Sequence, residues 1–322
     1  MDICLIGDFN EKSDEGFKNI AHSLNKELSE FHDVPNLNIK SFFTFPFWNK
    51  IGRINPPIII HYFSDPSPSS VIFLKFLRLI WKDPITVLSA LHPQFTFSLK
   101  LNLLIFKPDL ILTQSYQSDL FFNELNCRTQ FLSNGVDLEK FYPVDPTVKN
   151  QLREKYGISK ESFVVLHVGH IKKDRNVKLV IIGPDDGFLN VPAKQVKTLK
   201  IEDHTIFTGL VPEKEKLETF VDADLLVYPG ILEIFGLVPF EALRCGTPVI
   251  VCDDCGCGEI IKVADCGYLV RYGDNNQLLE KIKYALGHQS ENDKKVKNGQ
   301  KFINEKLSWN RLVNEYENFI TA

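Results

Sequence analysis

The stretch from residue 229 to residue 250 decides the fold class of this chain. It reads Pro229-Gly-Ile-Leu-Glu-Ile-Phe-Gly-Leu-Val-Pro-Phe-Glu-Ala-Leu-Arg-Cys-Gly-Thr-Pro-Val-Ile250. An apolar segment typical of a buried strand precedes it, and Glu233 falls in the loop that follows. Pro239 near the start and Gly246 at the end delimit a helix that carries Glu241. Two carboxylates flanking a helix N-terminus predict a site for an elongated ligand that carries phosphate.

The residues between the two glutamates sharpen this interpretation. Phe-Gly-Leu follows the first glutamate, and a Cys-Gly-Thr-Pro-Val turn follows the second. The pattern resembles the Glu-x7-Glu element of retaining family 4 glycosyltransferases, which have GT-B architecture. The resemblance implies that Glu233 holds hydroxyls of a donor sugar, that Glu241 accepts hydrogen bonds from the ribose, and that Phe235, Gly236 and Leu237 help to bind the donor. The alternative is an ordinary helix with solvated carboxylates.

Strand and helix signals alternate through most of the chain, which predicts an α/β fold with parallel sheets. Strands are expected at 3–7, 58–62, 85–90, 110–113, 129–132, 163–168, 177–182, 205–207, 225–228 and 249–251. Helices are expected at 17–31, 71–82, 213–221, 238–244, 277–285 and 302–320. The resemblance implies GT-B: two Rossmann-like domains whose parallel sheets face each other across a cleft. Neither half carries Gly-x-Gly-x-x-Gly after its first strand, which disfavours a nicotinamide or flavin cofactor.

A turn with little apolar periodicity divides the chain near its middle. Asn134-Gly135 is a turn dipeptide, and two prolines follow by residue 146. The run Asn-Gly-Val-Asp-x4-Phe-x-Pro is similar to the interdomain segment of the same family. We therefore expect an acceptor-side domain at 1–145, a nucleotide-sugar-binding domain at 146–305, and a C-terminal helix at 306–322 that returns to the first domain.

Two residues of the first half match family positions. Gly16 follows the first strand, where the family has a glycine loop that closes over the donor diphosphate, and a glycine permits close backbone approach. His92 follows a predicted strand, where the family has a histidine that faces the sugar. The alternatives are a helix-entry glycine and a structural histidine.

A basic loop follows the first strand of the second half, in Val168-Gly-His-Ile-Lys-Lys-Asp-Arg-Asn176. Where the family has an arginine and, five residues later, a lysine that bind the diphosphate, this chain has His170 and Arg175, with Lys172 between them. The loop remains cationic, as a diphosphate leaving group requires. A solvated basic loop is the alternative, and the exchanges leave open a protein that binds a nucleotide sugar without turnover.

The same loop is short for a parallel crossover. Eight residues, 169–176, separate the two expected strands, whereas such a connection normally takes a dozen or more and includes a helix. The crossover helix of the family has no counterpart here. We expect one face of the second sheet to be thinly covered, or to be filled by a neighbouring element.

Composition limits the remaining possibilities. With 322 residues, 44% apolar residues and a net charge of −4, the sequence predicts two domains and gives no support for nucleic-acid binding. The opening Met-Asp-Ile-Cys-Leu-Ile-Gly lacks the basic lead of a signal peptide, so we expect a cytoplasmic protein with reduced thiols. Cys252, Cys255 and Cys257 have no second cluster with zinc spacing, and a glycine-loop role before Glu259 is favoured over a metal site.

The first half is basic and aromatic. Between residues 38 and 107 it has eight Lys or Arg against two Asp, with many Phe and Trp. Ser69-Ser70 could cap a helix at 71–82 in which Lys75, Arg78 and Lys82 share one face. Such a helix suits the interface of an anionic membrane, and the alternative is a core helix with one solvated stripe.

The function that the resemblance implies is transfer of a hexose-type sugar, with retention, from a nucleoside diphosphate donor to a glycan or lipid-linked acceptor. No metal and no organic cofactor are expected, because basic groups can stabilise the leaving diphosphate. The alternatives are a non-catalytic nucleotide-sugar-binding protein and a GT-B nucleotide-sugar epimerase. Neither the donor, the acceptor nor the oligomeric state follows from the sequence.

Overall fold

The chain forms two compact units, each built on a six-stranded parallel sheet. The computed structural model describes residues 3–9, 16–54, 59–64, 66–90, 95–155, 158, 164–168, 180–185, 187, 189–230 and 235–321. Contacts group residues 1–135 with 307–322 as the first unit and 136–306 as the second. The predicted fold class of two Rossmann-like α/β domains with parallel sheets is confirmed.

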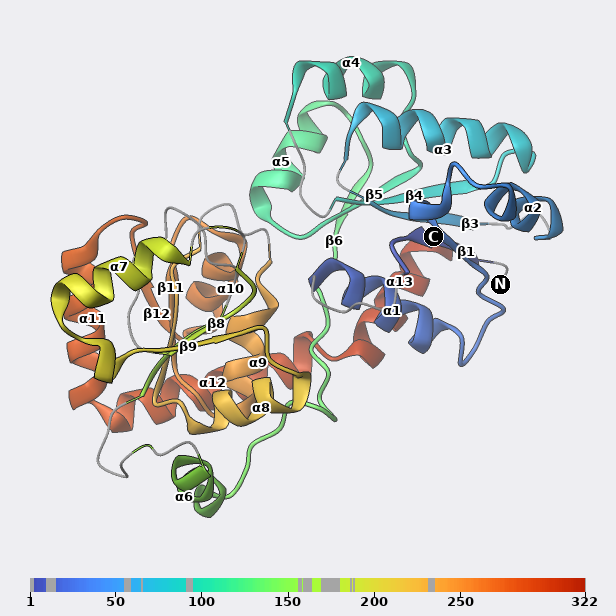
Figure 1. Ribbon diagram of the computed structural model, residues 1–322. Coiled ribbons are helices and arrows are strands. Elements are labelled where there is room, and N and C mark those ends of the chain that lie inside the picture. The colour runs from blue at the N-terminus through green and yellow to red at the C-terminus, as the bar shows by residue number, and fades with distance from the viewer. Residues whose placement is uncertain are drawn as a thin grey trace. The chain divides into compact units, whose positions relative to one another are not determined.

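The first unit has the strand order β2-β1-β3-β4-β5-β6. Its strands are β1 (Ile3–Gly7), β2 (Asn36–Asn38), β3 (Ile59–Ser64), β4 (Ile85–Ala90), β5 (Leu110–Thr113) and β6 (Thr129–Phe131). Its helices are α1 (Gly16–Leu28), α2 (Phe45–Arg53), α3 (Pro68–Ile80), α4 (Phe97–Ile105), α5 (Tyr116–Glu124) and α13 (Trp309–Thr321). Figure 1 shows α3 and α4 along one face of the sheet and α1 and α13 along the other. The sheet is thus covered on both faces, as parallel sheets require.

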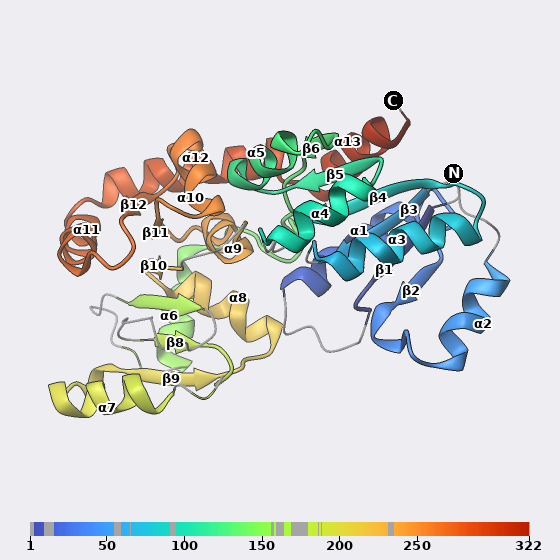
Figure 2. The same ribbon diagram turned by 90° about the horizontal axis from the view of Figure 1, so that it is seen from above.

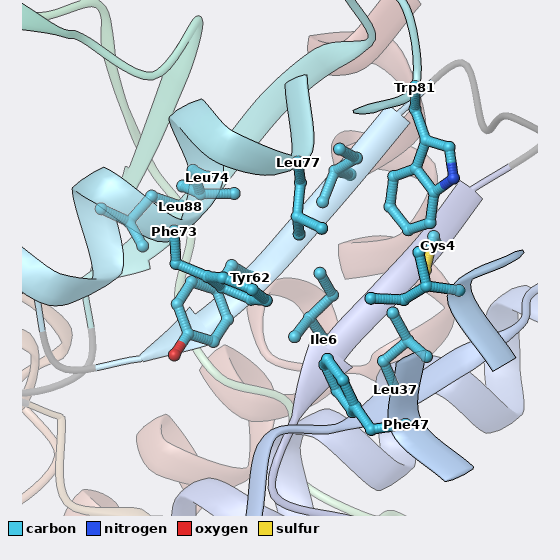
Figure 3. Close-up of a cluster of buried hydrophobic side chains, with 12 residues drawn as sticks. Cys4, Ile6, Leu37, Phe47, Tyr62, Phe73, Leu74, Leu77, Trp81 and Leu88 are labelled. Atoms are coloured by element: carbon cyan, nitrogen blue, oxygen red, sulfur yellow. The ribbon is translucent and has the colours of Figure 1, made fainter. Parts of the chain in front are cut away.

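The face beneath α3 holds a continuous apolar core. Alternate residues of β1, Cys4 and Ile6, point to this face and meet Leu74 and Leu77 of α3 together with Phe47 of α2 (Figure 3). The period of two along the strand meets the helical period of α3, so each element contributes one apolar face. Burying side chains of this size stabilises the unit by about 1.5–3 kcal/mol each.

Helix α3 begins earlier than the sequence predicts. Its N-cap is Ser67, whose Oγ accepts a hydrogen bond from the backbone N–H of Ser70 at 3.2 Å, and Pro68 occupies the first turn. The predicted cap at Ser69-Ser70 is therefore wrong, because proline fits the first helical position without losing a hydrogen bond. The single basic face predicted for this helix is wrong too. Lys82 lies beyond the end of the helix with φ 56°, and Arg78 is held by Asp109 at 3.2 Å.

The opposite face of β3 carries a fully buried histidine. His61 stacks between Phe63 and Tyr316 of α13, and its Nε2 lies 2.7 Å from Ser89 Oγ. Burial lowers the pKa of His61 to about 3, because the charged imidazolium would lose its water. The first unit therefore depends on this ring remaining neutral.

We expect acid to destabilise the first unit through His61. The unfolded chain binds a proton at a pKa of about 6.5, whereas the folded chain resists it down to about 3. The contribution of neutral His61 to the free energy of unfolding is complete above pH 6.5. Below that pH the free energy of unfolding falls by about 1.4 kcal/mol for each pH unit. Urea unfolding between pH 7 and pH 4 should show this slope, and His61→Gln should flatten it. The exposed control His204→Gln should keep the wild-type slope. If His61→Gln kept it as well, the assignment to His61 would be wrong.

The second unit has the strand order β12-β11-β10-β7-β8-β9. Its strands are β7 (Val165–Val168), β8 (Val180–Ile182), β9 (Ile206–Gly209), β10 (Leu225–Tyr228), β11 (Val249–Cys252) and β12 (Tyr268–Val270). Its helices are α6 (Pro146–Lys155), α7 (Asn190–Leu199), α8 (Glu213–Asp222), α9 (Leu237–Cys245), α10 (Gly256–Ala264), α11 (Asn275–Gly287) and α12 (Gln289–Lys306). Figure 2 turns the view to show both sheets from above. No described helix is both long and apolar enough to cross a membrane.

Burial in this sheet falls toward one edge. Every residue of β10 and β11 is buried, whereas β9 is mostly exposed. β7 and β8 are parallel neighbours, so the chain crosses over between Val168 and Val180. The crossover at 169–179, for which the sequence predicts no helix, lies outside the described residues. Thin coverage of one face therefore stays a prediction.

The end of the chain differs from the single helix predicted at 302–320. α12 ends at Lys306 and α13 begins at Trp309, with Leu307 buried between them. The backbone carbonyl of Ser308 accepts a hydrogen bond from Leu312 N at 3.1 Å, so a new helix starts there. Serine is favoured at the position before a helix. The amphipathic pattern continues across residue 308, so this helix boundary was not recognised in the sequence. Contacts place the division between the units at Gly135 and Val136, earlier than the expected boundary after residue 145.

The Asn-Gly-Val-Asp run spans the boundary between the two units, and its first two residues pack within the first unit. Asn134 and Gln114 are buried and exchange two side-chain hydrogen bonds, at 2.5 and 3.2 Å. Gly135 lies against the indole of Trp309, so closely that a Cβ would overlap the ring. Asp137 Oδ1 then accepts hydrogen bonds from the N–H groups of Glu139 and Lys140, both at 3.1 Å. Glycine is thus required by the close approach of the α13 indole to the backbone.

We expect Gly135→Ala to destabilise the first unit by about 1–3 kcal/mol, because the added methyl forces Trp309 or the backbone to move. Gly52 in α2 is a matched control, since a Cβ there meets nothing within 4 Å. Gly52→Ala should leave stability unchanged or raise it, because alanine favours a helix. Chemical denaturation of the three proteins, followed by Trp fluorescence, measures the difference. Equal midpoints for wild type and Gly135→Ala would refute the packing argument.

Candidate functional site

The topology of the second unit marks one point on its sheet for a ligand. The chain runs outward from β7 to β9 on one side and from β10 to β12 on the other, and β7 pairs with β10. The loops that leave these two strands therefore start side by side. In open parallel sheets, ligands bind at the carboxyl ends of the strands where the strand order reverses. In the sequence, residues 169–179 follow β7 and residues 229–236 follow β10; the basic run and Glu233 fall within these segments, outside the described residues.

The start of α9 shows why Phe-Gly-Leu stands there. Gly236 is the N-cap residue with φ 67°, a left-handed conformation that favours glycine. Phe235 is buried, with its ring centroid 5.2 Å from that of Phe240, so the turn is anchored from below. Leu237 is the first helical residue. The free N–H groups of this turn, with the positive end of the helix dipole, give α9 an N-terminus suited to phosphate.

Glu241 lies further along α9 and is buried. Its Oε2 is 2.6 Å from Nζ of Lys216, which comes from α8. The ammonium of Lys216 also lies over the rings of Phe141 and Phe220, at 5.7 and 5.6 Å from their centroids. The aromatic faces and the carboxylate together stabilise the lysine charge. Lys216 is a residue of this site that the sequence argument missed, because nothing in the sequence near it indicates its partner.

Burial shifts the pKa values of two other ionisable groups near Glu241. The pKa of Lys140 is lowered, mainly because its ammonium is partly desolvated, although Asp137 and Glu241 oppose the shift. Burial raises the pKa of the Cys245 thiol to about 12, and the nearby Glu241 charge adds to this. Cys245 therefore remains a thiol at neutral pH and is unsuited to act as a nucleophile.

The end of α9 and the strand after it explain the Gly-Thr-Pro-Val turn. Gly246 caps the helix with φ 101°. The hydroxyl of Thr247, which is buried, donates to the carbonyl oxygen of Phe220 on α8. Together they fix α9 against α8 and return the chain to β11 in register with β10. The motif thus holds Glu241 and the N-terminus of α9 in a set geometry.

The three cysteines near α10 form a close, buried group. Cys255 Sγ lies 3.2 Å from Cys257 Sγ and 3.0 Å from the carbonyl oxygen of Cys252. Gly258 packs so tightly on that carbonyl that a Cβ would overlap it, so the glycine brings the start of α10 onto the end of β11. Over the described part of the chain, no three His, Cys, Asp or Glu side chains form a group that could hold a metal ion.

Of the predicted site residues, the structure describes five. Phe235, Gly236, Leu237 and Glu241 lie on α9 and the turn before it, and Gly16 begins α1 in the first unit. The predicted Glu233, His92, His170, Lys172 and Arg175 lie outside the described residues. Their roles, like the ribose contact of Glu241, stay predictions.

The second unit is similar in sequence to known proteins. Residues 149–302 match the family model described as glycosyl transferases group 1. The N-acetyl-alpha-D-glucosaminyl L-malate synthase of Bacillus anthracis is 26% identical over 204 residues, covering 58% of this chain and 52% of that protein. The capsular polysaccharide biosynthesis glycosyltransferase CapM of Staphylococcus aureus is 27% identical over 210 residues, covering 58% and 54%. The chain spans about half the length of these curated relatives.

Solved structures share the fold over the whole chain. HepE of Anabaena, solved in complex with UDP and glucose, has a TM-score of 0.80 at 17% identity. The match covers 100% of this chain and 100% of HepE. A sucrose-phosphate synthase of Thermosynechococcus elongatus has a TM-score of 0.81 at 18% identity, covering 98% of this chain and 97% of that one. The family match and the curated relatives agree: residues 149–302 of the chain carry a domain of the glycosyl transferases group 1 type.

Proposed function

We propose that the protein is a retaining glycosyltransferase that moves a hexose-type sugar from a nucleoside diphosphate donor to a glycan or lipid-linked acceptor. The observation that carries this proposal is the Glu-x7-Glu segment where β10 passes into α9, within a group 1 glycosyltransferase domain. This position lies at the strand-order reversal of the sheet, where parallel folds bind their ligands.

A nucleotide-sugar donor suits the chemistry of this turn. The first N–H groups of α9, apart from Pro239, which has none, lack an acceptor within the helix and could bind phosphate oxygens, and the helix dipole favours negative charge there. HepE of Anabaena has been solved with UDP and with UDP-glucose, which supports a donor of this class for a chain with the same fold.

Glu233 would hold hydroxyls of the donor sugar, and Glu241 would accept hydrogen bonds from the ribose. The ion pair with Lys216 fixes the Glu241 carboxylate in place, and its second oxygen would serve the ligand. Gly16 would admit the diphosphate close to the backbone. These assignments rest on the resemblance of the sequence to the family.

The leaving diphosphate would be stabilised by cationic groups. His170, Lys172 and Arg175 supply three basic side chains in the loop after β7. Charge developing on the bridging oxygen would be met by these groups and by the α9 N-terminus, so neither metal nor organic cofactor is required. His92 would hydrogen-bond the sugar from its other side.

The test measures nucleoside diphosphate release from UDP-, GDP- and ADP-sugars, with and without EDTA. We expect one donor to turn over and EDTA to leave the rate unchanged. The anomeric configuration of the product, read by NMR, tests retention. Recovery of an isomerised nucleotide sugar without diphosphate release would instead identify an epimerase.

If no donor turns over, the melting temperature measured with each donor separates the remaining possibilities. If no donor is consumed but one raises the melting temperature, the protein binds a nucleotide sugar without catalysis. His170 and Arg175, which stand where the family has an arginine and a lysine, would be the first residues to test as the cause of that result. If no donor changes the melting temperature, the proposal fails altogether.

A further inference from the structure

The outer face of α3 is apolar where a surface helix should be polar. Ile72, Phe76 and Leu79 recur at the helical spacing of one face and are all exposed, with Leu79 76% exposed. Lys75 is the charged residue among them. The opposite face of α3 already packs on the core. The exposed apolar surface of Ile72 and Leu79 is therefore not part of that core.

Helix α4 repeats the pattern beside α3. Phe97, Leu101, Leu104 and Ile105 share its outer face, and Phe97 and Ile105 expose 76% and 74% of their surface. Leu99 and Leu103 on its inner face are fully buried. The two helices pack against each other on the same side of the sheet (Figure 1), so their outer faces join.

Aromatic rings extend this surface toward α2. Trp48 of α2 lies edge-on to Phe76, with ring centroids 5.9 Å apart, and Phe42 lies 5.2 Å from Trp48. Phe43 lies 5.0 Å from Phe42 and is 96% exposed. We call this the α3–α4 surface, and its exposed apolar members are Phe43, Phe45, Ile72, Phe76, Leu79, Phe97, Leu101, Leu104 and Ile105. Contiguous apolar surface of this kind marks an interaction site.

The charged residues within α2, α3 and α4 are all basic. Helices α2, α3 and α4 contain no Asp or Glu, and they contribute Lys50, Arg53, Lys75, Arg78 and Lys100. Asp83 and Asp109, which follow α3 and α4 in the sequence, both pair with Arg78, whereas Asp65, three residues before α3, lies outside the described residues. Apolar side chains beside lysines that form no ion pair with a carboxylate in the described part of the chain fit an apolar layer beneath anionic groups. A second copy of the chain would instead bring like charges together.

We propose that the α3–α4 surface binds the surface of an anionic lipid bilayer. Exposed Phe and Leu side chains would enter the headgroup and acyl boundary, while Lys75 and Lys100 pair with lipid phosphates. The proposal concerns attachment and stands independently of the transferase activity, so either can fail without the other. It would bring the first unit to a membrane, where a lipid-linked acceptor resides.

The test is co-sedimentation of the full chain with vesicles. Two compositions are compared, phosphatidylcholine alone and phosphatidylcholine with phosphatidylglycerol. We expect binding to the anionic vesicles that weakens with added salt. Lys75→Gln with Lys100→Gln should weaken it by about fivefold per lysine. Leu79→Glu with Leu104→Glu should weaken it by on the order of tenfold or more, because charge is placed in the apolar layer.

Matched controls separate this effect from misfolding. Leu286→Glu makes the same change at an exposed leucine of α11 in the second unit and should bind as the wild type does. Unchanged melting temperatures confirm that each variant is folded, as the exposure of Leu79 and Leu104 leads us to expect. Absence of wild-type binding, equal binding to both compositions, or undiminished binding of the Leu79→Glu, Leu104→Glu variant would overturn the proposal. If light scattering showed a wild-type dimer that the Leu79→Glu, Leu104→Glu variant disrupts, and the wild type did not bind vesicles, the surface would be assigned to self-association instead.

Discussion

The Glu233→Ala variant is expected to release nucleoside diphosphate on the order of 100-fold more slowly than the wild type. A hydrogen bond to a charged group contributes about 1.5–3 kcal/mol, and a carboxylate that holds two sugar hydroxyls would lose both bonds on truncation. Glu233 lies outside the described residues; in the sequence it follows β10 and precedes Gly236, the N-cap of α9. Steady-state release from the donor identified by the panel measures the effect.

A control shows whether the loss is specific. Glu305→Ala removes a carboxylate from an exposed position of α12, and its rate should stay within a factor of two or so of the wild type. Both variants should melt at nearly the wild-type temperature. If Glu233→Ala retained full activity, the assignment of the Glu-x7-Glu segment to donor binding would be wrong.

The Arg153→Met variant is expected to lose about 3–5 kcal/mol of unfolding free energy in the second unit. Arg153 on α6 is buried, with its Nη2 2.7 Å from Asp224 Oδ2 and its Nε 3.3 Å from Asp222 Oδ1. Methionine fills much of the same volume but leaves the buried carboxylate of Asp222 without its guanidinium. The Asp224 carboxylate also binds Lys149 at 2.6 Å and the N–H of Val164 at 2.7 Å, so it retains partners.

The pH dependence of this variant carries further information. Burial raises the pKa of Asp222, while Arg153 and Lys149 oppose the shift, so removing Arg153 should raise that pKa further. A carboxyl group with a raised pKa costs stability as the pH rises through that value. The deficit of Arg153→Met should therefore be larger at pH 7 than at pH 4. Urea unfolding at both pH values measures it.

An exposed arginine of the same unit provides the control. Arg271→Met at the end of β12 should change stability by less than about 0.5 kcal/mol, because its side chain is solvated. If Arg153→Met proved as stable as this control, the cluster of α6 with the start of β10 would not hold the second unit together.

Local patterns in the sequence were sufficient for the order of the elements. Strands β1, β4, β5 and β10 have the bounds that the apolar runs predict, because a buried parallel strand needs several consecutive apolar residues. The end of α9 at Gly246 was predicted for a similar reason, since its φ of 101° is one that other residues avoid, whereas Gly236 was not recognised as the N-cap. The resemblance to the family rested on the residues around this helix.

The sequence pattern failed where a boundary depends on a cap. The break before Trp309 lies within an unbroken amphipathic repeat, and only the packing of Leu307 and the turn at Ser308 place it. Ser67 rather than Ser69 caps α3 because Pro68 fits the first turn. Each alternative differed by a few hydrogen bonds, which a propensity argument does not resolve.

By itself, the sequence determined the α/β class, the parallel sheets, the resemblance to a glycosyltransferase family and the two glutamates on which the proposed chemistry rests. The tertiary structure decided which distant residues meet: Lys216 with Glu241, Trp309 with Gly135, and the outer faces of α3 and α4 as one surface. The reason is physical. Helices, strands and turns are fixed by neighbours in the chain, whereas ion pairs, close approaches and surfaces depend on how whole elements pack, and packing is a property of the complete fold.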